Sequence, residues 1–126
     1  MVNKYFFLDT GAFYAFVDKK DAEHNKVVNI LKNQNEQFVT SNYIVDELIT
    51  LFRFRGVPFE KFSLFIDTLW NEEICNILRV TIEIDREAWK LMKKYKDHDF
   101  SFTDCTSFIL MQDYGMKKVC SMDKHF

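Results

Sequence analysis

Four acidic residues that lie far apart in the sequence could together do metal chemistry. Asp9 follows the apolar stretch FFL, Glu47 lies in VDELI, Asp104 in SFTDC and Asp123 in SMDKHF. Carboxylate oxygens are typical ligands of Mg²⁺ and Mn²⁺, which keep several waters for substrate and nucleophile. A metal of this kind activates water and stabilises the charge of a phosphodiester transition state. If these side chains converge, they favour phosphoryl-transfer hydrolysis.

Taken singly, each acidic residue also has a structural explanation. The stretch SFTD matches the helix-capping pattern S-x-x-[DE], so Asp104 could stabilise a helix start. Glu47 could be a surface helix residue, and Asp9 and Asp123 could be turn residues. However, no Lys or Arg lies within two positions of Asp9, Glu47 or Asp104. Converging carboxylates without local neutralisation would require a cation.

The elements expected around these residues would bring them to one edge of a sheet. Short apolar runs predict strands, and three- and four-residue apolar spacing predicts helices. The strands are expected at residues 4–9, 37–40, 75–80 and 118–121, and the helices at 21–31, 42–55, 58–71, 85–95 and 101–114. This alternation predicts a parallel sheet covered on both faces, with strand ends and helix starts along one edge. All four acidic residues belong to that edge, whereas Asp46 points roughly 100° away from Glu47 around its helix.

Composition narrows the class of protein. The chain has 126 residues, of which 48% are hydrophobic, so we expect a single domain over residues 1–126 with one core. Only three Gly and one Pro are present, which argues against an all-β fold. The tripeptide at Asp9, DTG, therefore does not indicate an aspartic protease, whose two active-site loops lie on β lobes.

Location and partners are also constrained. No run approaches roughly 18 apolar residues, and the N-terminus lacks the order of a signal peptide, so we expect a cytoplasmic protein without a membrane partner. Cys75, Cys105 and Cys120 share no metal-binding spacing and are expected to be buried, reduced thiols. Because the formal net charge is -2, the chain lacks an overall positive field, and any nucleic acid would have to bind through a local group of side chains.

In this order along the chain, LDT, V-x-E-L with LFRFRG, SFTDC and SMDKHF resemble the PIN domain, and most closely its VapC-type toxins. The resemblance implies a three-layer α/β/α sandwich and an endoribonuclease that requires Mg²⁺ or Mn²⁺. It implies that Asp9, Glu47, Asp104 and Asp123 hold the metal and act in catalysis. Thr10 and Ser121 match hydroxyl positions near metal and substrate. Seven cations could contact phosphates near the acidic edge or could simply form solvated charged faces, namely Lys19, Lys20, Arg53, Arg55, Lys117, Lys118 and Lys124. Of these, Arg53 and Lys124 are the favoured candidates.

The resemblance further implies an RNA substrate and an antitoxin partner. A homodimer or an antitoxin could use the aromatic residues crowded into residues 52–70, which are Phe52, Phe54, Phe59, Phe62, Phe65 and Trp70. The same residues could instead fill the core.

Two other functions remain open from the sequence. The first is a non-catalytic module that keeps the fold and binds protein or RNA, and a metal-binding measurement would separate it from the enzyme. The second is a phosphatase of the haloacid dehalogenase type or a receiver domain, since both use an Asp after a first strand. The phosphatase needs a second Asp where this chain has Gly11, and the receiver needs an acidic pair at that strand end, so both are disfavoured.

Overall fold

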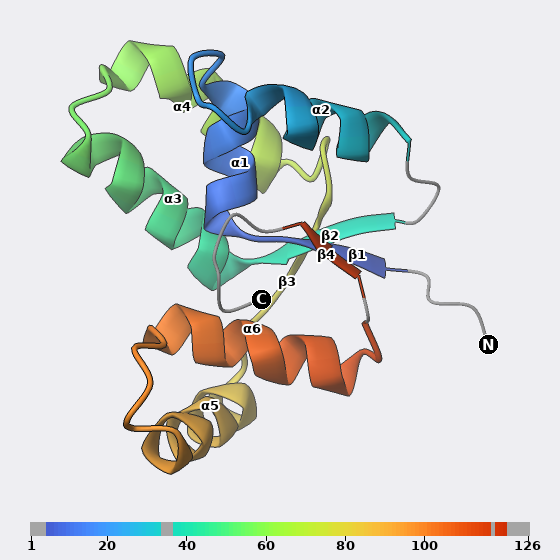
Figure 1. Ribbon diagram of the computed structural model, residues 1–126, viewed down its shortest axis with the longest axis vertical. Coiled ribbons are helices and arrows are strands. Elements are labelled where there is room, and N and C mark those ends of the chain that lie inside the picture. Colours follow the sequence, from blue (N-terminus) through green and yellow to red (C-terminus); the bar gives the residue numbers. More distant parts are fainter. Residues whose placement is uncertain (1–4, 34–36, 117, 121–126) are drawn as a thin grey trace.

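The computed structural model describes residues 5–33, 37–116 and 118–120. A parallel sheet of four strands runs through the middle of the molecule, in the order β3-β2-β1-β4 (Figure 1). The strands are β1 (Tyr5–Leu8), β2 (Gln37–Ser41), β3 (Asn76–Leu78) and β4 (Lys118–Cys120). In the central strand β1, Phe7 pairs with Val39 on one side and with Val119 on the other. All four expected strands are present.

Helices cover both faces of this sheet. On one side lie α1 (Thr10–Val17), α2 (His24–Lys32), α3 (Asn42–Phe54) and α4 (Phe59–Trp70), and on the other side α5 (Ile82–Lys94) packs with α6 (Phe102–Asp113) (Figure 1). Because Phe6, Phe7 and Leu8 of β1 are all buried, this strand reads as a continuous apolar run. The three-layer α/β/α sandwich predicted from the sequence is confirmed.

Side-chain caps set where two of the helices begin. The hydroxyl of Ser41 accepts a hydrogen bond from the Ile44 amide at the start of α3, over 3.1 Å. The hydroxyl of Thr81 does the same for the Ile84 amide, over 3.3 Å, so α5 begins at Ile82, three residues earlier than its apolar spacing suggested.

The helix α1 was absent from the sequence-based prediction. It starts at Thr10, immediately after β1, whereas the first helix was expected only from residue 21. Ala12, Phe13, Tyr14 and Ala15 are all buried, so the helix has no polar face along most of its length. Apolar periodicity cannot reveal a helix that is buried nearly all round.

The core accounts for part of the aromatic crowd in α3 and α4. The rings of Phe52 and Phe62 stack 4.8 Å apart with an interplanar angle of 12° and hold the two helices together. Cys75 and Cys105 are buried and unbridged, as expected, while the side chain of Cys120 lies outside the part that the structure describes. Within the described residues, no helix has the length and apolar character needed to cross a bilayer.

Candidate active site

The sheet order locates the candidate site. From β1 the chain moves outward through β2 to β3, and then returns to the other side of β1 to form β4. In open α/β sheets, ligands bind beyond the carboxyl ends of the strands where the order reverses in this way. Asp9 directly follows β1 at this reversal, and Asp104 lies on α6, the helix that leads into β4.

Asp9 is held at the end of β1 by the first turn of α1. It is the N-cap of that helix, and its Oδ1 accepts a hydrogen bond from the Ala12 amide over 3.0 Å. The side chain is 4% exposed. A buried carboxylate is costly unless it is hydrogen-bonded, and here the helix N-terminus also favours its negative charge. The hydroxyl of Thr40 further ties β2 to the Leu8 carbonyl, over 2.8 Å, next to Asp9.

Glu47 is linked to the same strand end through Thr10. It lies in the second turn of α3, and its Oε1 accepts a hydrogen bond of 2.5 Å from Thr10 Oγ1. Thr10 is buried, and Glu47 is half-buried. The Thr10 hydroxyl therefore fixes the Glu47 carboxylate close to the end of β1, where Asp9 lies. This is a more specific role than an ordinary hydrogen bond at a strand end.

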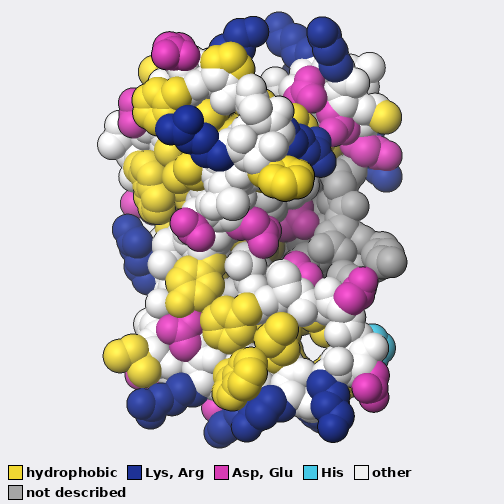
Figure 2. Space-filling view, turned by 90° about the vertical axis from the view of Figure 1, so that its left-hand side faces the viewer, with side chains coloured by type: hydrophobic (Ala, Val, Ile, Leu, Met, Phe, Trp, Pro, Cys, Tyr) yellow, Lys and Arg dark blue, Asp and Glu magenta, His cyan; other side chains and the backbone are white. Residues whose placement is uncertain are grey.

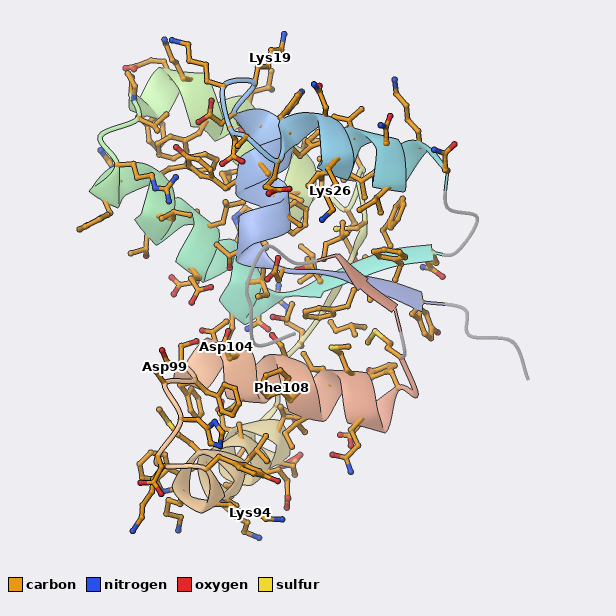
Figure 3. The ribbon with its side chains drawn as sticks, viewed as in Figure 1. Lys19, Lys26, Lys94, Asp99, Asp104 and Phe108 are labelled. Atoms are coloured by element: carbon orange, nitrogen blue, oxygen red, sulfur yellow. The ribbon has the colours of Figure 1, made fainter. Side chains whose placement is uncertain are left out.

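Asp104 reaches the site from the opposite layer while it also caps α6. Its Oδ2 accepts a hydrogen bond from the Ser101 amide, and its own amide donates to Ser101 Oγ, both over 3.0 Å. In Figure 3 the residue lies at the start of α6, on the side toward the sheet. The capping explanation considered from the sequence is therefore correct. It is compatible with ligand binding, since a carboxylate has acceptor sites for more than one partner.

These three carboxylates line one cavity, of about 550 Å³, which we call the carboxylate cavity. Its lining comes from both sides of the sheet and consists of Asp9, Thr10, Gly11, Tyr14, Asp21, Glu23, Ile44, Glu47, Leu51, Arg55 and Asp104. Five of these residues are acidic and one is a cation. Figure 2 shows Asp and Glu side chains gathered across the middle of one face, between the two helical layers. The predicted convergence of Asp9, Glu47 and Asp104 is thus present in the structure.

The donor chemistry of the cavity fits a hard divalent cation. All five acidic residues offer oxygen, and the single guanidinium of Arg55 cannot neutralise them all. Within the described residues, no three His, Cys, Asp or Glu side chains stand close enough to form a complete ligand set by themselves. Mg²⁺ does not require such a set, because it commonly binds through one or two carboxylates and retains several waters.

The remaining sequence candidates fall elsewhere. Asp123, Ser121 and Lys124 lie outside the described residues. Arg53 is exposed, with its guanidinium carbon 5.5 Å from the centre of the Phe59 ring, and it does not line the carboxylate cavity. Asp46 is exposed and absent from the lining, as its helical position predicted.

Asp21 and Glu23 line the cavity although the sequence did not single them out for the site, and Arg55 lines it although the sequence analysis favoured Arg53 among the candidate phosphate contacts. Asp21 and Glu23 belong to the loop between α1 and α2, where Asp21 Oδ1 accepts a hydrogen bond of 2.8 Å from the Glu23 amide. Without α1, the sequence gives no reason to place that loop next to the end of β1. Arg55 follows the end of α3, and no local pattern distinguishes it from Arg53.

Known proteins share this sequence pattern and fold. A family model for the PIN domain matches residues 6–126. A VapC ribonuclease from Archaeoglobus fulgidus is 28% identical over 124 residues, covering 94% of this chain and 77% of the relative. Ribonuclease VapC26 from Mycobacterium tuberculosis is 28% identical over 123 residues, covering 94% of this chain and 87% of the relative.

A solved structure has the same fold. The crystal structure of Mycobacterium tuberculosis VapC20, described as a toxin that cleaves the sarcin-ricin loop, matches with a TM-score of 0.86 at 23% identity, covering 94% of this chain and 90% of VapC20. Because the family model spans nearly the whole sequence, the chain belongs to the PIN domain family.

Proposed function

We propose that this protein is a metal-dependent endoribonuclease of the VapC type, with residues 1–126 as one PIN domain. The observation that carries the proposal is the convergence of Asp9, Glu47 and Asp104 on one cavity at the end of the central strand. Relatives named as ribonucleases match over almost the whole chain, which supports this chemistry.

In this proposal Asp9, Glu47, Asp104 and Asp123 form the acidic set that holds Mg²⁺ or Mn²⁺. The bound metal would supply an activated water and stabilise charge at the phosphorus and on the leaving oxygen. The protein's part is to fix the carboxylates beforehand. The first turn of α1 orients Asp9, the Thr10 hydroxyl orients Glu47, and the amide of Ser101 orients Asp104.

The cavity also offers a side chain that can contact the RNA substrate. Arg55 is the cation among the described lining residues, and it can contact a phosphate oxygen of RNA. Ser121 and Lys124 stay candidates for substrate contact by their positions in the sequence. No side chain needs to become a covalent nucleophile, since water performs the attack.

The VapC resemblance extends the proposal to the protein's partners. We assign it as the toxin of a type II toxin-antitoxin pair that acts in the cytoplasm. We also propose a homodimer formed through α3 and α4, because Phe54, Phe59, Leu64 and Trp70 on these helices are exposed. Exposed apolar residues concentrated on neighbouring helices are typical of protein interfaces.

A cleavage assay tests the enzymatic function. Wild type, Asp104→Asn and Asp46→Asn, purified identically, are incubated with a panel of structured RNAs that includes tRNA and ribosomal RNA. We expect internal cleavage by wild type and Asp46→Asn with Mn²⁺, loss of cleavage with EDTA, and a fall of orders of magnitude for Asp104→Asn. Equal cleavage by Asp104→Asn would place the active site elsewhere. No cleavage by wild type would favour the non-catalytic interaction module.

A further inference from the structure

A second cavity adjoins the carboxylate cavity along α1. Its volume is about 710 Å³, and it shares Tyr14 and Arg55 with the first cavity. Asp9, Thr10 and Gly11, at the start of α1, line the first cavity, whereas Val17, at its end, lines the second. An eight-residue helix is about 12 Å long, so the two cavities together can hold an extended ligand.

The two cavities carry opposite charges. Three cations line the second cavity, namely Lys19, Arg55 and Lys61, against one acidic residue, Asp18. Asp18 Oδ1 accepts a hydrogen bond of 2.9 Å from the Lys20 amide in its own turn. In the part of the chain that the structure describes, the one salt bridge joins Lys90 to Glu87, so none of the three cations is neutralised by an ion pair there. Lys19 lies beyond the end of α1 in Figure 3, on the far side of that helix from Asp104.

Helix stability does not explain all of these cations. Arg55 follows the end of α3, where a positive charge suits the helix dipole. Lys61 is in the first turn of α4, at the end where the dipole disfavours a positive charge. The guanidinium carbon of Arg55 is 4.3 Å from the centre of the Tyr14 ring. Stacking on a ring orients a guanidinium and leaves the N–H groups at its rim able to bind a phosphate.

We propose that this second cavity, which we call the phosphate groove, binds the phosphates that flank the cleaved bond of an RNA strand. The inference rests on the proposed ribonuclease function and assigns the path of its substrate from the carboxylate cavity past Arg55 to Lys19 and Lys61. A polynucleotide carries phosphates at regular intervals. One phosphate can bind at the carboxylate cavity when that cavity holds a divalent cation, and the neighbouring phosphates then lie beside the cations of the second cavity. Because the formal net charge is -2, such local contacts with phosphates must provide the electrostatic part of the RNA affinity.

Apolar residues complete the phosphate groove. Val57, Phe52 and Phe62 line it together with the cations. An acidic peptide could also meet the three cations, but it would carry further carboxylates toward the acidic residues of the first cavity. The position of the two cavities on either side of Tyr14 and Arg55 therefore favours the nucleic acid.

Binding of a labelled single-stranded RNA, measured by fluorescence anisotropy in EDTA, tests the groove without cleavage. Lys19→Ala and Lys61→Ala are each expected to weaken binding about fivefold at low salt, the value for removing one solvent-exposed charge interaction. The slope of log affinity against log salt should fall by about 0.7 for each lysine that no longer neutralises a phosphate. The matched control is Lys93→Ala, which removes an exposed lysine from α5, on the other side of the sheet. Lys61→Arg should restore binding.

Failure of the groove is distinguishable from failure of the ribonuclease function. If the groove is correct, Asp104→Asn loses cleavage but binds RNA in EDTA at least as tightly as wild type, because one carboxylate that repels phosphate is removed. The lysine variants should raise KM more than they lower kcat. If Lys19→Ala and Lys61→Ala bind and cleave RNA like Lys93→Ala, the phosphate groove is wrong while the ribonuclease stands, even if these variants lose a protein partner. If wild type neither binds nor cleaves RNA, both proposals fall.

Discussion

At the scale of single residues, a buried hydroxyl connects two parts of the acidic site. Thr10 follows Asp9 in the sequence and donates to Glu47, which comes from another helix. Thr10→Val keeps the shape of the side chain but removes the donor. We expect RNA cleavage to fall about fivefold, because a net loss of about 1 kcal/mol in positioning Glu47 has roughly that effect on rate. Thr10→Ser is the control and should retain activity. Wild-type activity in Thr10→Val would show that Glu47 does not depend on this bond.

A second residue-scale prediction concerns pH and stability. Burial, with a smaller contribution from the charge of Glu72, raises the pKa of the Cys75 thiol from 9.0 to about 12. The unfolded thiol loses its proton near pH 9, whereas the folded thiol keeps it, so folding binds more protons above that pH. The contribution to stability is therefore complete below pH 9 and declines as the pH rises toward 12, by at most about 1.4 kcal/mol per pH unit. Urea unfolding at pH 8 and 10 should show a smaller loss in Cys75→Ala than in wild type. Parallel pH profiles would contradict the assignment.

At the scale of elements, two helix caps allow an effect on stability to be distinguished from an effect on RNA cleavage. Ser101 caps α6 and binds the Asp104 carboxylate, while Thr81 caps α5 outside the site. Ser101→Ala and Thr81→Ala should each lower the free energy of unfolding by about 1 kcal/mol. Only Ser101→Ala should also reduce cleavage, because it loosens the helix turn that orients Asp104. Urea denaturation and the RNA assay on the same preparations measure both effects. If both variants lost the same activity, the fall in cleavage would reflect lower stability and not the orientation of Asp104.

The same elements explain how far the sequence could predict the molecule. The strands and the helices with one apolar face follow from local patterns, and so does the edge on which Asp9, Glu47 and Asp104 meet. The helix α1 does not, because its buried surroundings remove the polar face on which periodicity depends. Its absence from the prediction also hid the loop that carries Asp21 and Glu23. The choice of Arg55 over Arg53 depends on how α3 ends against Tyr14, which is a tertiary contact.

At the scale of the whole molecule, the exposed apolar residues of α3 and α4 predict self-association. Phe54 is 86% exposed and Leu64 is 75% exposed. Replacing both by Ser should shift the protein toward monomer in analytical ultracentrifugation, since an interface loses affinity when its apolar anchors are removed. Ile82→Ser, at an exposed position on α5, is the matched control and should leave the oligomeric state unchanged. A wild-type protein that stays monomeric at micromolar concentration would rule out the proposed dimer.

At the same scale, the central proposal is that carboxylates from the two helical layers jointly hold a divalent cation for RNA cleavage. Isothermal titration calorimetry with Mn²⁺ on wild type, Asp9→Asn and Asp46→Asn tests this most directly. Asn is as good an N-cap as Asp, so Asp9→Asn should keep α1 while losing the charge that attracts the metal. We predict that Asp46→Asn binds Mn²⁺ like wild type and that Asp9→Asn binds it at least tenfold more weakly, in line with the loss of a close charge interaction of more than about 1.4 kcal/mol. Equal Mn²⁺ binding by all three proteins would contradict a metal site in the carboxylate cavity.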